Sequence, residues 1–166
     1  MLRRGPHRYA LLLLGAISVA LFACAGGGST LGGWHALQRG MELWYERSAG
    51  PSGETAFCLL YTIAPGQDYA IEHVAPFAQL EGAPALRLRA TATRVLHLAV
   101  VLKDRAGQTH ECAQTLLPGS WRELLFQDFR PGPSDWASVE SVQFVDRTGG
   151  LGGQGPVSLK LLGLPQ

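Results

Sequence analysis

Charged residues, cysteines and catalytic motifs are all scarce in this chain of 166 residues. Only 16% of the residues are charged, the formal net charge is +1, and the basic side chains form no stripe. This balance gives no basis for binding nucleic acid. Hydrophobic residues nevertheless make up 46% of the chain, which excludes an intrinsically disordered protein. The length predicts one domain.

Signatures of common enzymes and metal sites are also absent. The sequence contains no G-x-S-x-G, H-E-x-x-H or S-x-x-K motif. A match to G-x-G-x-x-G over 150–155 precedes a predicted strand, whereas a dinucleotide site needs a helix there. No standard zinc spacing relates the histidines His35, His73, His97 and His110. We therefore predict a protein without enzymatic activity, bound metal or cofactor.

The N-terminus has the pattern of a bacterial export signal. Basic residues in MLRRGPHRY precede ALLLLGAISVALFA, an apolar run of signal-peptide length that is too short for a comfortable transmembrane span. The sequence LFAC at 21–24 resembles a bacterial lipobox, which implies that Cys24 becomes the lipidated first residue. Ordinary signal cleavage is the alternative, because Ala23 and Ala25 also fit a small-x-small site.

These features divide the chain into three predicted segments. A signal peptide covers 1–23, a lipidated cysteine with a glycine-rich tether covers 24–33, and the folded domain covers 34–166. Acyl chains on Cys24 would hold the protein at a membrane. The absence of Asp at position 25 favours the outer membrane. We therefore expect an exported, membrane-anchored lipoprotein that faces the periplasm or the cell surface.

Alternating apolar and polar residues dominate the predicted domain. Leu86 and Leu88 share one face of a strand, and Arg87 and Arg89 share the other. FCLLYTI, LHLAVVLK, SVQFV and VSLKLLG alternate in the same way, and turn signals such as AGPSG, APGQD and LPGS separate the segments. About eight to ten short strands, each with one apolar face, predict an all-β jelly-roll sandwich of antiparallel strands.

Four segments follow one another in an order that carries a family resemblance: LHLAVVLKDRAGQTHECAQTL, GSWRELLFQDF, SVESVQF and GPVSLKLLGL. Through them, the stretch from Ala85 to Leu162 resembles the galactose-binding-like β-sandwich family, which includes many bacterial carbohydrate-binding modules. The resemblance implies a sandwich that binds carbohydrate. It also implies that Trp121, which begins a strand, packs in the core as a wedge between the sheets.

A structural calcium ion is a further feature of many members of that family. An acidic residue on the last strand often helps to hold the ion, but this sequence has Lys160 in that region and no acid. Glu42 and Glu46 could supply the other half of such a site. A solvent-facing strand is the alternative interpretation of this pair, and with Lys160 it argues against calcium.

Exposed aromatic rings and arginine forks are the side chains that a glycan site needs. Outward strand parity or loop position therefore selects the candidate ligand-binding residues Tyr69, Arg87, Arg89, His97 and Trp136. The arginines could instead only solubilise a strand face, and the Trp136 ring could instead cover the core.

Cys58 and Cys112 are the two cysteines that remain besides the predicted anchor. An exported protein meets an oxidising compartment, which permits a disulfide bond between them. Strand periodicity places each opposite the expected core residues, so they could bond only if their strands are neighbours. Two free thiols are the alternative.

The predicted function is non-catalytic binding of carbohydrate at the cell envelope. The alternative is a protein-interaction or structural module of an envelope complex, because one fold serves many functions. The expected partners are accordingly a glycan or an envelope protein, together with the membrane through the lipid anchor. A glycan binder should combine aromatic and polar groups in a cleft, whereas an interaction module should expose a flat apolar patch.

Overall fold

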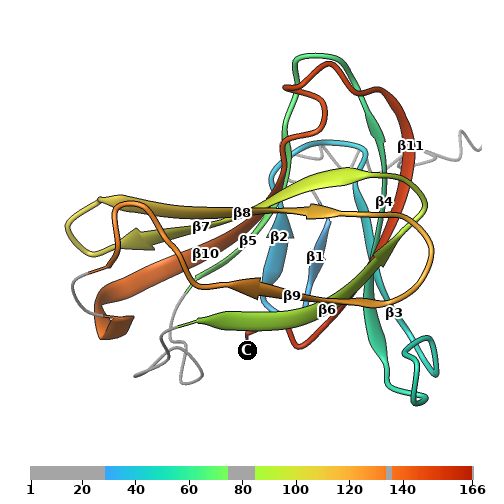
Figure 1. Cartoon of the computed structure of the whole chain (residues 1–166), viewed down its shortest axis with the longest axis horizontal. Helices are drawn as coiled ribbons and strands as arrows, with labels where there is room; N and C mark the ends of the chain where they lie inside the picture. Colours follow the sequence, from blue (N-terminus) through green and yellow to red (C-terminus); the bar gives the residue numbers. More distant parts are fainter. Residues whose placement is uncertain (1–28, 75–84, 134–135, 166) are drawn as a thin grey trace, which may run out of the picture.

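The computed structural model describes residues 29–74, 85–133 and 136–165. Two antiparallel sheets pack face to face in a jelly-roll β-sandwich (Figure 1). The predicted signal peptide and Cys24 lie outside the described residues. No helix within the described ranges has the length and apolar character of a transmembrane span.

The first sheet has six strands in the order β1-β2-β5-β10-β7-β8. Its strands, in chain order, are β1 (Thr30–Leu31), β2 (Trp34–Ala36), β5 (Tyr69–Val74), β7 (Leu96–Asp104), β8 (Thr109–Leu116) and β10 (Val139–Asp146). A short 3₁₀ helix, Trp136–Ser138, leads into β10.

The second sheet has five strands in the order β3-β4-β11-β6-β9. Its strands, in chain order, are β3 (Glu42–Glu46), β4 (Ala56–Ile63), β6 (Leu86–Ala92), β9 (Arg122–Phe126) and β11 (Gly155–Leu162). The last strand in the sequence, β11, lies at the centre of this sheet between β4 and β6. The connection from β10 to β11 therefore crosses from one sheet to the other.

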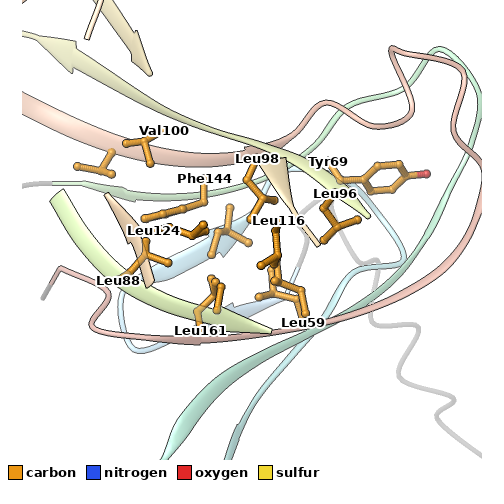
Figure 2. Packing of buried hydrophobic residues seen from close by; sticks show 14 of the residues in the cluster. Leu59, Tyr69, Leu88, Leu96, Leu98, Val100, Leu116, Leu124, Phe144 and Leu161 are labelled. Carbon is orange, nitrogen blue, oxygen red and sulfur yellow. The ribbon is translucent and has the colours of Figure 1, made fainter. Parts of the chain in front are cut away.

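The core lies between the two sheets and consists of the inward residues of each strand. Figure 2 shows leucines of the five-stranded sheet facing Phe144 and Val100 of the six-stranded sheet. Burial of one such side chain contributes about 1.5–3 kcal/mol relative to leaving it exposed. The alternation in the sequence follows from this arrangement, because each strand turns only one face to the core.

One polar contact crosses the core. The Tyr61 hydroxyl of the five-stranded sheet donates a hydrogen bond of 2.8 Å to Asp146 of the six-stranded sheet. Asp146 also accepts bonds from the amide and hydroxyl of Thr148. Burial, and then the charge of Asp146, raises the pKa of Tyr61 well above its usual range. The hydroxyl therefore stays protonated and keeps the two sheets joined at this point.

The structure confirms the all-β sandwich and extends the predicted strands. The described residues form eleven strands, where the sequence predicted about eight to ten. The additional strands include β1, which lies inside the segment predicted as a tether. Gly32 and Gly33, with φ of 57° and 83°, allow the tight turn through which β1 pairs with β2. The tether prediction is therefore wrong for its last residues.

The disulfide bond that the sequence left open between Cys58 and Cys112 is not formed, and both cysteines are free, which is the alternative. Cys112 lies in β8 opposite Val100 and belongs to the core of the sandwich. Cys58 lies in β4 opposite Lys160, on the outer face of the other sheet. Cys112 shares the parity of the core residue Leu116, so the alternation within β8 argued against an outward side chain.

Candidate functional site

The outer face of the five-stranded sheet carries a row of side chains that crosses the strands. Trp44 lies opposite Cys58, Cys58 opposite Lys160, and Lys160 opposite Thr91. Trp121 immediately precedes β9, where the register places it beside Thr91. Neighbouring strands are about 4.8 Å apart, so the row sets two tryptophans on opposite sides of a polar centre.

A groove of about 610 Å³ occupies the β6–β11 side of this face. Its lining comes from β6, β11, the β3–β4 loop and the β8–β9 loop: Ala49, Thr91, Ala92, Thr93, Pro118, Gly119, Trp121, Ser158 and Lys160. We call this space the main groove. Its size lies within the usual range for small-ligand pockets.

The β8–β9 loop forms one wall of the main groove and is fixed to β6 by two hydrogen bonds. The Thr91 hydroxyl donates to the carbonyl of Gly119, and the Gly119 amide donates to the carbonyl of Ala92 over 3.1 Å. Gly119 has a φ of 102°, a conformation that glycine adopts without strain. This loop therefore holds Trp121 in a defined position at the wall.

Trp121 lies on the outer face and not in the core, so the prediction of a wedge between the sheets is wrong. Its ring packs against the small cluster of Ala56, Cys58 and Leu162, and it also lines the main groove. A signal for this position was present in the sequence. Trp121 shares its strand parity with the outward residue Glu123, not with the core residue Leu124.

The β3–β4 loop, residues 47–55, covers part of the same face. Ala49 packs against the cluster around Leu162. Gly50 approaches so closely that a Cβ atom there would lie 3.0 Å from Leu162 Cδ1. At the end of the loop, Glu54 accepts a hydrogen bond from the Arg89 guanidinium of β6. The loop therefore crosses β4 and β11 and borders the main groove.

Lys160, Arg87 and Arg89 of this face each have a carboxylate partner. Lys160 Nζ lies 2.8 Å from Glu46, which lowers the pKa of Glu46 chiefly through this hydrogen bond. Arg87 Nε lies 3.5 Å from Glu123. The Cys58 thiol donates a hydrogen bond of 3.6 Å to Glu46. Burial, followed by the charge of Glu46, raises the pKa of the Cys58 thiol to about 11. The face therefore offers hydrogen-bond donors with little unpaired charge.

The ion pair between Lys160 and Glu46 also bears on calcium. The ammonium group of Lys160 pairs with Glu46, one of the two carboxylates that could have served as calcium ligands. Among residues 29–74, 85–133 and 136–165, no group of three or more His, Cys, Asp or Glu side chains could hold a metal ion.

The five predicted ligand-binding residues do not lie on one face. Arg87 and Arg89 lie on the face of the main groove and line a second, smaller depression of about 200 Å³. Tyr69 was a wrong choice, because its side chain is 6% exposed and stacks on Tyr61 with ring centroids 5.1 Å apart. Figure 2 shows its ring at the edge of the core cluster.

His97 is separated from the arginines by the whole sandwich. It projects from the outer face of the six-stranded sheet, where its ring lies 3.3 Å from the Thr115 hydroxyl of β8. Its outward parity was predicted correctly, but its sheet was not. The side chain of Trp136 lies outside the described part of the structure.

The lining of the main groove carries groups that can bind a polar ligand. It combines an aromatic ring, the Thr91, Thr93 and Ser158 side chains, and one ammonium group. Among the described residues that line it, none is a carboxylic acid or a histidine.

Large exposed apolar side chains lie on several strands and loops of the described surface. Each lies on a different strand or loop: Leu37, Tyr45, Leu60, Val74, Val95, Leu117 and Leu151. Single exposed apolar residues of this kind are normal on soluble domains. Val95 and Leu117 adjoin across β7 and β8, because they continue the register that pairs Leu96 with Leu116.

No protein-family model matches the sequence, and no curated protein is significantly similar to it. Among solved structures, the chain is similar to the family 11 carbohydrate-binding module of a cellulosomal cellulase from Clostridium thermocellum. The TM-score is 0.51 at 14% identity, and the match covers 84% of this chain and 95% of the module. That module has also been solved in complex with a β-1,3-1,4-mixed-linked tetrasaccharide.

Two agarases contain a similar sandwich. An exo-β-agarase matches with a TM-score of 0.58 at 8% identity over 83% of this chain. A second agarase matches with a TM-score of 0.59 at 10% identity over 82% of this chain. This chain spans about a quarter of the length of each agarase, 24% in both cases. At these identities the matches establish the shared fold.

Proposed function

We propose that the folded domain binds carbohydrate in the main groove without altering it chemically. The observation that carries this proposal is the position of Trp121, whose ring is anchored on the sheet and lines a groove rich in hydroxyl groups. Sugar rings stack on aromatic faces, and their hydroxyls need donors and acceptors at the rim. The similar fold of the family 11 carbohydrate-binding module supports the same assignment.

Binding in such a groove should be weak. The site lies on the surface of a sheet and buries only part of a ligand, so we expect dissociation constants from micromolar to millimolar, roughly −8 to −4 kcal/mol. The non-catalytic role is supported by the fold that this chain shares with the family 11 carbohydrate-binding module.

Titration calorimetry tests the proposal directly. The folded domain is titrated with β-1,3-1,4-mixed-linked oligosaccharides and with agaro-oligosaccharides, the sugars suggested by the similar structures. Binding without release of new reducing ends is the expected result. If neither series binds at millimolar concentration and an envelope protein co-purifies from membrane extract, the domain is an interaction module.

We further propose that Cys24 carries the lipid anchor and that the protein resides at the outer membrane. Metabolic labelling with a fatty-acid analogue should mark the wild-type protein and leave Cys24→Ser unlabelled. The reason is that the lipobox-like LFAC ends an apolar run of signal length. Equal labelling of the two proteins, or a wild-type protein that is soluble after fractionation, would contradict the anchor.

A further inference from the structure

Two depressions adjoin on the outer face of the five-stranded sheet. The main groove includes Thr91 of β6 and Lys160 of β11, and the smaller depression includes Arg89 and Leu162, two residues away on the same strands. Residues two apart on a strand face the same side at a spacing of about 7 Å. The two spaces therefore lie one residue row apart.

The β3–β4 loop lies across the boundary between the two depressions. It leaves edge strand β3 after Glu46, rests on Leu162 through Ala49 and Gly50, and reaches β6 at Arg89. Ala49 lines the main groove, whereas Leu162 and Arg89 line the smaller depression. The loop and its contact with Arg89 thus close the main groove on the side of the smaller depression.

A side-chain bridge holds the loop to β6. Arg89 Nη2 donates to Glu54 Oε1, and the other carboxylate oxygen accepts from the Ser52 amide over 2.8 Å. The rest of the loop is tied to itself, through bonds between Gly50 and Glu54 and between Gly53 and Gly50. The side chains of Arg89 and Glu54 are 40% and 34% exposed, so a ligand chain can reach the bridge.

The bridge is present at neutral pH, where the Glu54 carboxylate is ionised. The hydrogen bond from Arg89 is the main cause that lowers the pKa of Glu54 below its ordinary value. A lowered pKa means that the contribution of the bridge is present at neutral pH and disappears only as the pH falls through the folded-state value.

From this arrangement we infer that the Arg89–Glu54 bridge limits the length of the oligosaccharide that the main groove accepts. The inference rests on the proposed function. With the bridge closed, a sugar chain in the main groove meets the loop, and further sugars gain no contacts. With the bridge broken, the chain can extend over Leu162 toward Arg87 and Glu123.

A length series of ligands tests the inference. Wild type, Glu54→Gln and Arg89→Gln are titrated with β-1,3-1,4-mixed-linked oligosaccharides and agaro-oligosaccharides, from the trisaccharide to the hexasaccharide. Wild-type affinity should stop rising before the hexasaccharide. In both bridge variants it should continue to rise, about tenfold tighter than wild type for the longest chain. Glu140→Gln is the control, because it removes the same charge from an exposed position of β10 on the other sheet.

The possible outcomes separate the two proposals. A wild-type affinity that rises steadily to the hexasaccharide overturns the inference without any variant. An identical length dependence in wild type and both bridge variants, all folded by thermal unfolding, also overturns it and leaves carbohydrate binding intact. Absence of binding by every protein at every length instead overturns the proposed function, and the inference with it.

Discussion

Replacing Trp121 by alanine should weaken carbohydrate binding about thirtyfold, or roughly 2 kcal/mol, the usual loss when a central aromatic anchor is removed. The ring lines the main groove and is held on the cluster of Ala56, Cys58 and Leu162. It therefore offers a stacking surface with little freedom to lose on binding. Titration of both proteins with the mixed-linked tetrasaccharide gives the ratio of dissociation constants.

Trp44→Ala is the matched control for this loss. Trp44 packs against the same cluster from β3 but does not line the main groove. Its removal should cost a similar amount of stability and change the dissociation constant less than about threefold, the scale of a distant, energetically neutral contact. Equal losses of binding in the two variants would show that the ring of Trp121 acts through the fold and not through stacking.

Replacing Asp146 by alanine should lower the free energy of unfolding by about 3 kcal/mol, because buried groups would lose a charged acceptor. Asp146 is 3% exposed and accepts from the Tyr61 hydroxyl and from Thr148. Without the carboxylate, a buried hydroxyl and a buried amide have lost their partner, and the sheets lose a contact across the core. Urea unfolding monitored by tryptophan fluorescence measures the change.

Two further variants give smaller expected losses of unfolding free energy, with which the loss in Asp146→Ala is compared. Tyr61→Phe removes only the donor and should cost about 1 kcal/mol, the usual net value of one hydrogen bond. Asp128→Ala removes a carboxylate from an exposed position after β9 and should change stability by less than about 0.5 kcal/mol. A loss in Asp146→Ala no larger than that in Asp128→Ala would mean that the contact across the core adds nothing.

The fold could be predicted because each strand alternates between core and solvent. In β6, Leu86 and Leu88 face the core, and Arg87 projects to the outer face, as the sequence predicts. Such a pattern is local to a strand. The pairing of β11 between β4 and β6 is not local, and no pattern within these strands specifies it.

The candidate site was predicted only in part for the same reason. Arg89 was placed correctly on an outer face, but His97 projects from the other sheet, because parity does not assign strands to sheets. Tyr69 has the parity of the core residue Ile71, so the alternation itself argued against it. For Trp121, the family resemblance implied a core position, whereas the outward parity that it shares with Glu123 matches its place on the outer face.

The most direct measurement of the central claim is a map of backbone amide chemical shifts during titration with the mixed-linked tetrasaccharide. The account predicts the largest changes along the main groove, at Thr91, Gly119 and Lys160, together with the indole N–H of Trp121. Changes confined to the outer face of the six-stranded sheet, around His97 and Gln143, would contradict it, as would a titration to millimolar ligand without any change.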